Sequence, residues 1–180
     1  MRSFALIMMF CICSFSAAAE VEEVRVGVLA QSCCGPAANK EEGAGINAEI
    51  AFSSPRFLSV LRSPRPVIGV IVATDSDATN IAYTGLDWTF ALPFRLFLSG
   101  GGGIAIHDGE TSFDSVADAS RVDDTLFLGC RALFRSSAEL GRAITGRLRA
   151  SVYWSHISNA GLCSENEGLD HLGARLSLTF

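Results

Sequence analysis

Eight stretches of the chain alternate between apolar and polar residues, and in nearly all of them the apolar residues hold the even-numbered positions. In the stretch 171–180, every even position is leucine, alanine or phenylalanine, whereas the odd positions are polar residues or glycine. Because successive side chains of a β-strand point to opposite faces, this period of two predicts strands with one apolar face. The eight stretches are 23–28, 46–53, 68–72, 82–90, 94–106, 125–135, 144–154 and 171–180.

The odd-numbered positions carry charges of both signs, which indicates a polar interior. The charges expected to point inward are those of Glu49, Asp87, Arg95, Arg131, Arg147, Arg149 and Arg175. Buried charges require partners of the opposite sign. An apolar outer face over paired inner charges predicts an all-β fold, an antiparallel barrel of eight strands. An interior of that width is filled by side chains, so we expect no pore.

The connections between the stretches follow the pattern of a membrane barrel. We expect short turns at 75–79, 93 and 136–139, and longer polar loops at 31–45 and 107–122. If both chain ends lie in the periplasm, the longer loops should follow the odd-numbered strands. Segment 54–65 is long for a periplasmic turn, and its residues 57–61 are expected to form a short interfacial helix.

Residues 1–19 have the three parts of a secretory signal peptide. Arg2 supplies a positive start, residues 4–12 an apolar centre and residues 17–19 a small-residue cleavage site. The apolar run is too short to span a bilayer as a helix. We therefore expect a cleaved signal peptide over 1–19 and a single outer-membrane β-barrel over 20–180.

Composition supports a membrane barrel over a soluble secreted β-domain, which is the alternative. The chain is 49% hydrophobic and only 18% charged, yet no later stretch approaches the ~18 apolar residues of a spanning helix. A secreted, apolar chain with alternating strands is typical of the outer membrane of a Gram-negative bacterium. The net charge of −5 becomes −6 once Arg2 is removed, and Lys40 is the only lysine. This balance argues against a nucleic-acid partner.

A candidate catalytic set lies near the C-terminus. His156 and Ser158 are two apart on one strand and so share its outward face, and Asp170 opens the next strand with the same parity. A serine nucleophile needs a base to take its proton, and the base needs an acid to fix its tautomer. We assign these roles to Ser158, His156 and Asp170. The intervening loop offers oxyanion donors in Asn159, Asn166 and amides such as that of Gly161.

The position of this set on a lipid-facing surface favours function, because polar side chains there are costly and usually functional. The alternative is a non-catalytic small barrel with a structural or adhesive role, whose rim residues touch headgroups and water. A phospholipase-like esterase would keep the same triad and change the substrate. Trp88 and Trp154 are expected in the interfacial aromatic belt.

The segments 156–162 and 166–170, together with the closing strand, resemble the outer-membrane lipid A 3-O-deacylases, also called acyloxyacyl hydrolases. The resemblance implies an eight-stranded barrel that hydrolyses the ester-linked acyl chain at the 3-position of lipid A, within lipopolysaccharide, at the outer leaflet. It implies that His156 is the base, Ser158 the nucleophile and Asn166 the oxyanion asparagine. The family's acid is typically glutamate, whereas Asp170 has a stem shorter by one methylene.

Glu167 is a second acid near this set, but it has the opposite parity. The esterase scheme needs neither a metal nor a cofactor, and His107 and His171 lack the neighbours of a metal site.

Four cysteines remain after cleavage of the signal peptide, and the periplasmic route permits disulfides. Closure of the barrel places the first and last outer loops side by side. We therefore expect a bridge from Cys163 to Cys33 or Cys34. Cys130 is the competing partner, although the expected strand register puts it nearer the middle of the sixth strand.

Overall fold

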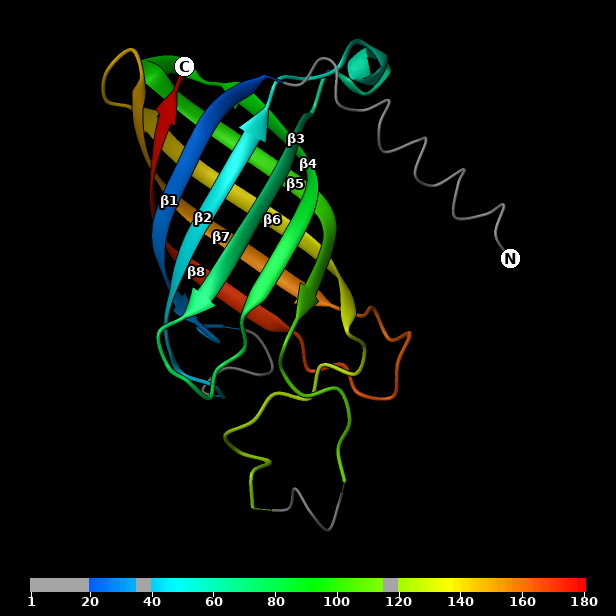
Figure 1. Ribbon diagram of the computed structural model, residues 1–180. Helices are drawn as coiled ribbons and strands as arrows, with labels where there is room; N and C mark the ends of the chain where they lie inside the picture. Colours follow the sequence, from blue (N-terminus) through cyan, green and yellow to red (C-terminus); the bar gives the residue numbers. More distant parts are fainter. Residues whose placement is uncertain (1–19, 35–39, 115–119) are drawn as a thin grey trace.

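The computed structural model describes residues 20–34, 40–114 and 120–180; the expected signal peptide lies outside the described residues. Eight antiparallel strands close into a barrel, each paired with its sequence neighbours and the first with the last (Figure 1). The strands are β1 (Val21–Gln31), β2 (Gly43–Phe52), β3 (Arg65–Ala73), β4 (Ile81–Ala91), β5 (Leu96–His107), β6 (Ala132–Ala143), β7 (Leu148–Ser158) and β8 (Leu169–Thr179). The predicted fold is confirmed. Within the described ranges, no helix is long and apolar enough to cross a membrane.

Closure leaves the sheet without a free edge, which is how a barrel satisfies its backbone in lipid. In the closing pair, Val26 lies opposite Leu176, and both side chains are 52% exposed on the outer wall. Their neighbours Arg25 and Ser177 also lie opposite each other and are buried. The even positions therefore face outward and the odd positions inward, as the alternation predicts.

The interior is filled by paired charges. Arg25 lies among three carboxylates, with nitrogen–oxygen distances of 2.7 Å to Glu49, 3.0 Å to Asp87 and 3.2 Å to Glu23. Arg175 contacts the same Glu49 at 2.7 Å. A gap lined by Arg25, Glu49 and Asp87, among others, has a volume of about 10 Å³, room for one water molecule at most. Closely packed ion pairs therefore fill this part of the barrel interior.

Three of the charges expected inside are instead exposed. Arg95 and Arg147 lie in turns, and Arg131 lies just before β6. The alternation of apolar and polar residues continues past the ends of the strands. The prediction from odd and even positions therefore assigned these three side chains to the interior. A charged side chain in a connection reaches water and avoids the cost of burial.

The sixth strand begins later than the sequence indicates. The expected strand 125–135 is mostly loop, and the expected turn 136–139 lies within β6. Leu126, Phe127 and Leu128 are buried in the loop region before the strand. Ser136, by contrast, belongs to the strand and lies opposite His156. The expected start of the sixth strand was therefore too early, because buried leucines in a loop resembled a strand and a serine within the strand resembled a turn.

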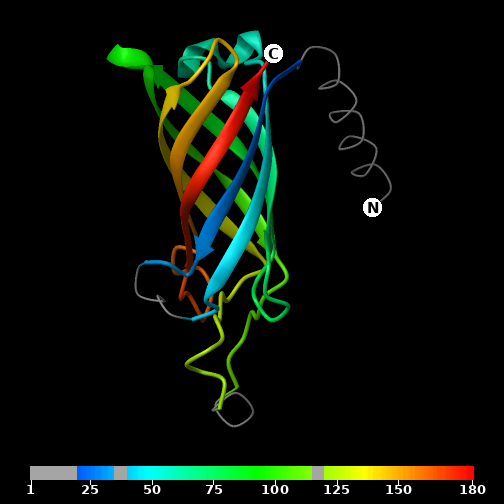
Figure 2. The ribbon, with the colours of Figure 1, turned by 90° about the vertical axis from the view of Figure 1, so that its left-hand side faces the viewer.

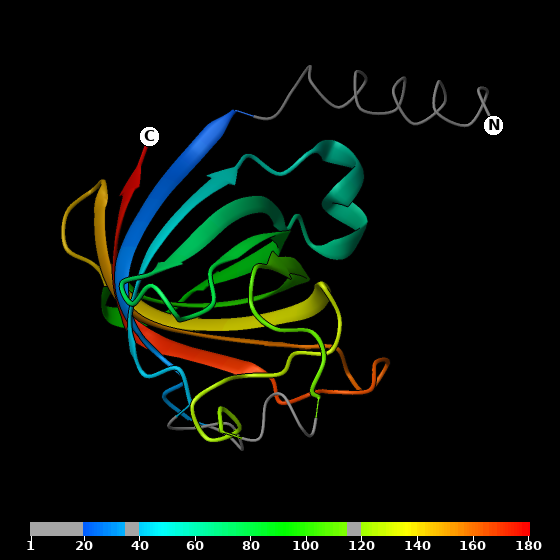
Figure 3. The same cartoon turned by 60° about the horizontal axis from the view of Figure 1, so that its bottom comes forward.

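The two ends of the barrel differ in their connections (Figures 2 and 3). The connections after even-numbered strands lie at the end that holds the C-terminus, and the longest of them contains a 3-10 helix at Arg56–Leu61, as expected for this segment. The loops after β1, β3, β5 and β7 gather at the other end. The longer loops therefore follow the odd strands with one exception, because the connection 53–64 after β2 is longer than the connection 74–80 after β3. β7 and β8 meet at the end that carries the loops after odd strands.

Candidate functional site

His156 and Asp170 are direct partners across β7 and β8, so their side chains share one face of the sheet. That face is the outer wall, on which Val152 lies exposed two positions from Trp154. The Nδ1 atom of His156 lies 3.2 Å from Oδ1 of Asp170. The His156 side chain is 33% exposed and that of Asp170 only 10%. The structure thus brings the expected base and acid together.

Trp154 supplies a second contact to the same carboxylate. Its Nε1 donates a hydrogen bond of 3.0 Å to Oδ1 of Asp170. Its ring lies nearly parallel to the His156 imidazole, at 13° and with 6.2 Å between ring centres. The sequence places Trp154 only in the aromatic belt, because no sequence signal says where an indole N–H points.

Ser158 is the last residue of β7 and lies on the same outward face, opposite Phe134 of β6. Two positions along a strand span about 6.6 Å, so an imidazole can reach across the repeat. In the part of the chain that the structure describes, the Ser158 hydroxyl has no hydrogen-bond partner. Catalytic hydrogen bonds are often long without substrate and tighten when it binds. Ser136 is a second hydroxyl beside His156, on β6 rather than β7.

Gly168 closes the space on another side of the imidazole. Its backbone has φ +73°, and a Cβ atom at this position would lie 3.0 Å from Cε1 of His156 and 3.6 Å from Nε2. A larger residue would therefore press on the ring and would also be strained in the left-handed conformation. Glycine lets the loop lie directly against the imidazole.

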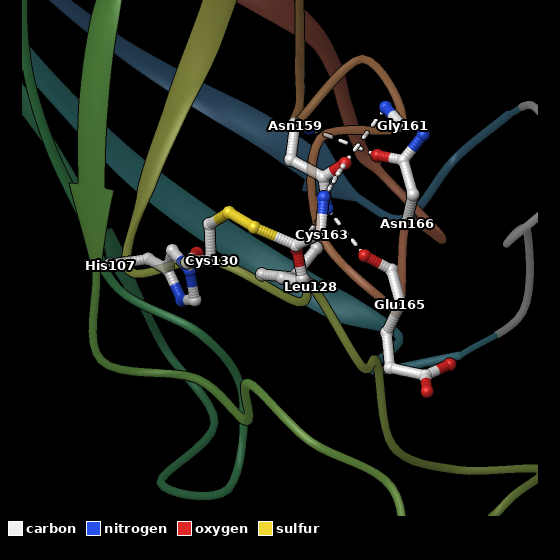
Figure 4. Close-up of a disulfide and its surroundings, with 8 residues drawn as sticks. All are labelled: His107, Leu128, Cys130, Asn159, Gly161, Cys163, Glu165 and Asn166. Carbon is white, nitrogen blue, oxygen red and sulfur yellow. Dashed lines mark hydrogen bonds between the residues drawn. A yellow bond between two sulfur atoms is a disulfide. The ribbon is translucent and has the colours of Figure 1, made fainter.

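The expected oxyanion donors divide into two groups (Figure 4). Asn159 is 2% exposed, and its Oδ1 accepts the Gly161 N–H at 2.8 Å while its Nδ2 donates to the carbonyls of Leu128 and Glu165. The Asn159 side chain and the Gly161 N–H are thus occupied in holding the loop. Asn166 accepts the Asn159 backbone N–H through Oδ1 at 2.9 Å. Its Nδ2 donates to no other described residue.

Sequence comparison places this hairpin in a known group. The family model described as lipid A 3-O-deacylase (PagL) matches residues 73–179. The chain belongs to this family. The matched region includes the whole of β7 and β8 and the loop between them. No curated protein matches the chain.

Solved structures agree with the family on the fold. The outer membrane enzyme PagL is 15% identical, with a TM-score of 0.61 over 88% of this chain and 99% of that chain. Neisserial surface protein A is 9% identical, with a TM-score of 0.52 over 91% of this chain and 100% of that one. The N-terminal β-barrel domain of Pseudomonas aeruginosa OprF is 12% identical, with a TM-score of 0.50 over 89% and 100%. The protein is an outer-membrane β-barrel of a Gram-negative bacterium.

The disulfide in this deacylase-family barrel differs from the expected one. Cys163 is bonded to Cys130, with 5.9 Å between their Cα atoms, and not to Cys33 or Cys34 (Figure 4). Because β6 begins only at Ala132, Cys130 lies at the loop end of the barrel rather than in the middle of a strand. The bridge joins the loop before β6 to the loop that carries Asn159 and Asn166.

Cys33 and Cys34 remain thiols, with 2.6 Å between their sulfur atoms. Burial and the hydrogen bond to Cys34, together with the nearby charge of Asp170, raise the pKa of Cys33 to about 12. Cys33 is therefore protonated at neutral pH. Since the thiolate is the nucleophilic form, Cys33 is a poor nucleophile at this pH.

Glu167, the second acid near the site, is committed to the loops. Its Oε1 pairs with Lys40 at 2.6 Å, and its Oε2 accepts the Phe127 N–H at 2.8 Å. These contacts join the first, third and fourth outer loops. Asp170 is the carboxylate that pairs with His156.

Proposed function

We propose that this family member is an esterase that removes the 3-O-linked acyl chain of lipid A. The observation that carries the proposal is the His156–Asp170 pair, 3.2 Å apart on the outer wall beside Ser158. A histidine and a carboxylate on a lipid-facing surface have a clear use in an enzyme whose substrate is itself a membrane lipid. Membership of the lipid A 3-O-deacylase family supports the same substrate.

In this mechanism, Asp170 accepts the Nδ1–H of His156 and so leaves Nε2 unprotonated and facing the substrate. Nε2 takes the proton of Ser158 as its oxygen attacks the ester carbonyl. The tetrahedral oxyanion receives a hydrogen bond from Nδ2 of Asn166. His156 then returns the proton to the sugar oxygen as the ester bond breaks. Water, activated by the same imidazole, hydrolyses the acyl-enzyme and releases the fatty acid.

The acyl chain has an apolar place beside the nucleophile. A groove of about 170 Å³ is lined by Ile104, Cys130, Ala132, Leu133, Phe134, Asn159 and Leu162. Phe134 lies directly opposite Ser158. An acyl chain in this groove would present its ester carbonyl to the serine without leaving the membrane. We assign Asn159 and Gly161 to shaping the loop around this groove, and the oxyanion contact to Asn166.

Mass spectrometry of lipid A from cells that express the protein tests this function. Wild type should remove one hydroxyacyl chain, and Ser158→Ala should leave lipid A unchanged. Ser136→Ala is the matched control, since this serine also lies on the outer wall next to His156. Its lipid A should resemble that of wild type.

Three outcomes contradict the proposal in different ways. Unchanged lipid A from cells with folded wild-type protein would leave a structural or adhesive barrel. Turnover of phospholipid instead of lipid A would indicate a phospholipase-like esterase. Activity that persists in Ser158→Ala and disappears in Ser136→Ala would move the nucleophile to β6.

A further inference from the structure

We propose that Trp154 is a positioning residue, whose indole N–H holds the Asp170 carboxylate against His156. The kinetic part of this inference rests on the proposed deacylase function. The geometric part concerns only the arrangement of the three side chains.

Two nitrogen atoms approach a single oxygen atom, and the indole N–H donates a hydrogen bond to it. Oδ1 of Asp170 lies 3.0 Å from Nε1 of Trp154 and 3.2 Å from Nδ1 of His156. Both nitrogen atoms belong to residues of β7, two positions apart on its outer face, and the oxygen atom belongs to Asp170 of β8. The indole N–H therefore holds the same oxygen atom that lies next to the imidazole.

The surroundings of the carboxylate make a second donor valuable. The Asp170 side chain is 10% exposed on a wall that is otherwise apolar, so little water can reach it. A carboxylate deprived of water is costly unless hydrogen-bond donors replace the water. An indole N–H donates and cannot accept, so Trp154 fixes the carboxylate without competing for the proton of the imidazole.

The length of the acid gives this contact a specific purpose. Asp170 carries its carboxylate on a stem one methylene shorter than that of a glutamate, so the carboxylate reaches less far from β8. The register compensates in part, because Asp170 lies directly opposite His156. The indole supplies the rest by fixing Oδ1 on the side of the imidazole.

Trp88 shows that placement in the aromatic belt is not sufficient to explain this contact. It is the other tryptophan of the chain, and its Nε1 donates to the backbone carbonyl of Leu61 at 2.8 Å. Leu61 belongs to the 3-10 helix at the opposite end of the barrel. The chain thus offers a matched pair of indoles, of which one contacts the site and one does not.

The kinetic test replaces each indole by phenylalanine, which keeps an aromatic ring and removes the donor. With lipid A in mixed micelles, Trp154→Phe should lower kcat about tenfold, as expected for a lost hydrogen bond to a charged group. KM should change less than twofold, because the substrate is not touched. Trp88→Phe should match wild type in both constants.

A second background separates positioning from packing. In Asp170→Glu, the longer acid reaches the imidazole with less help, so adding Trp154→Phe should lower kcat less than threefold. An equal tenfold loss in both backgrounds would show that the indole acts through packing and would overturn the inference. So would an unchanged kcat in Trp154→Phe when wild type is active.

NMR spectroscopy tests the contact between Trp154 and Asp170 without requiring enzymatic activity. The two indole N–H signals in an NMR spectrum of the micellar protein are assigned by the two phenylalanine variants. Asp170→Ala should shift the Trp154 signal and speed its exchange with water, and should leave the Trp88 signal unchanged. The Nδ1–H signal of His156 should be visible in wild type and broaden in Trp154→Phe. If wild type is inactive, the proposed function fails while these signals still support or overturn the positioning role.

Discussion

Two carboxylates in this barrel are held away from water, one in the interior and one on the outer wall, and their partners differ. Glu49 lies in the lumen and contacts three arginines, Arg25, Arg135 and Arg175, together with the hydroxyl of Tyr83. Asp170 contacts an indole and an imidazole on the lipid-facing side. The interior acid is thus neutralised by permanent cations, and the outer acid by neutral or titratable groups.

That difference matches the roles that we propose for the two carboxylates, a structural one for Glu49 and a catalytic one for Asp170. The guanidinium groups around Glu49 keep their charge at any physiological pH, so its field is already cancelled. The charge of Asp170 remains available when His156 gains a proton, and it can stabilise the imidazolium that a serine hydrolase forms. Changes at the two carboxylates should therefore affect different properties of the protein.

The largest effect should come from the outer set. His156→Gln removes the base and keeps a polar side chain of similar size, so the rate of deacylation should fall by about 10³-fold or more. Folding should not change, because the His156 side chain is 33% exposed on the outer wall. Lipid A mass spectrometry and the heat-dependent gel mobility of the barrel measure the two properties. A barrel that no longer folds would contradict this separation.

The interior acid should show the reverse behaviour. Glu49→Gln removes the negative charge that three buried arginines contact. The free energy of unfolding should therefore fall by about 3 kcal/mol or more. Deacylation per folded molecule should stay at the wild-type level. Urea unfolding in micelles checks the first part. Glu22→Gln is the control, because this half-exposed acid lies 3.9 Å from its nearest arginine and should change stability by less than about 0.5 kcal/mol.

The sequence predicts the barrel well because parity is a property of single residues. A period of two assigns each side chain to the wall or the lumen without any knowledge of distant partners. The same rule places His156 and Ser158 on one face. It fails where the strand ends, as for Arg131 and the start of β6, since the alternation continues into a connection while the backbone pairing does not.

The rest of the site depends on contacts between elements that no local pattern encodes. The bridge from Cys163 depends on where β6 begins. The occupation of Asn159 depends on carbonyls from two loops. The sequence shows Trp154 only as a tryptophan of the aromatic belt. The pairing of β7 with β8 places its indole N–H beside Asp170. Long-range register therefore decides which of the candidate polar groups are free for chemistry.

The disulfide extends this comparison, because it holds a loop of the outer site and lies away from the charges of the lumen. Replacing both Cys130 and Cys163 by alanine frees the loop that holds Asn166, and deacylation should fall about tenfold as the oxyanion donor loses its position. Loss of a bridge that closes 33 residues should also lower the free energy of unfolding by about 2–4 kcal/mol. Kinetics and urea unfolding of the same variant measure the two effects. Equal turnover in the variant and wild type would show that the loop is held by Asn159 alone.

The smallest effect should come from the backbone beside the imidazole. Gly168→Ala adds one methyl group 3.0 Å from Cε1 of His156, at a residue with φ +73°. The left-handed conformation costs alanine about 1 kcal/mol, and the methyl group displaces the ring from Ser158. We expect kcat to fall severalfold with KM nearly unchanged. Gly146→Ala is the control, because nothing lies within 4 Å of the added Cβ, and it should leave kcat unchanged. An equal fall of kcat in both variants would show that the effect of Gly168→Ala does not come from its contact with His156.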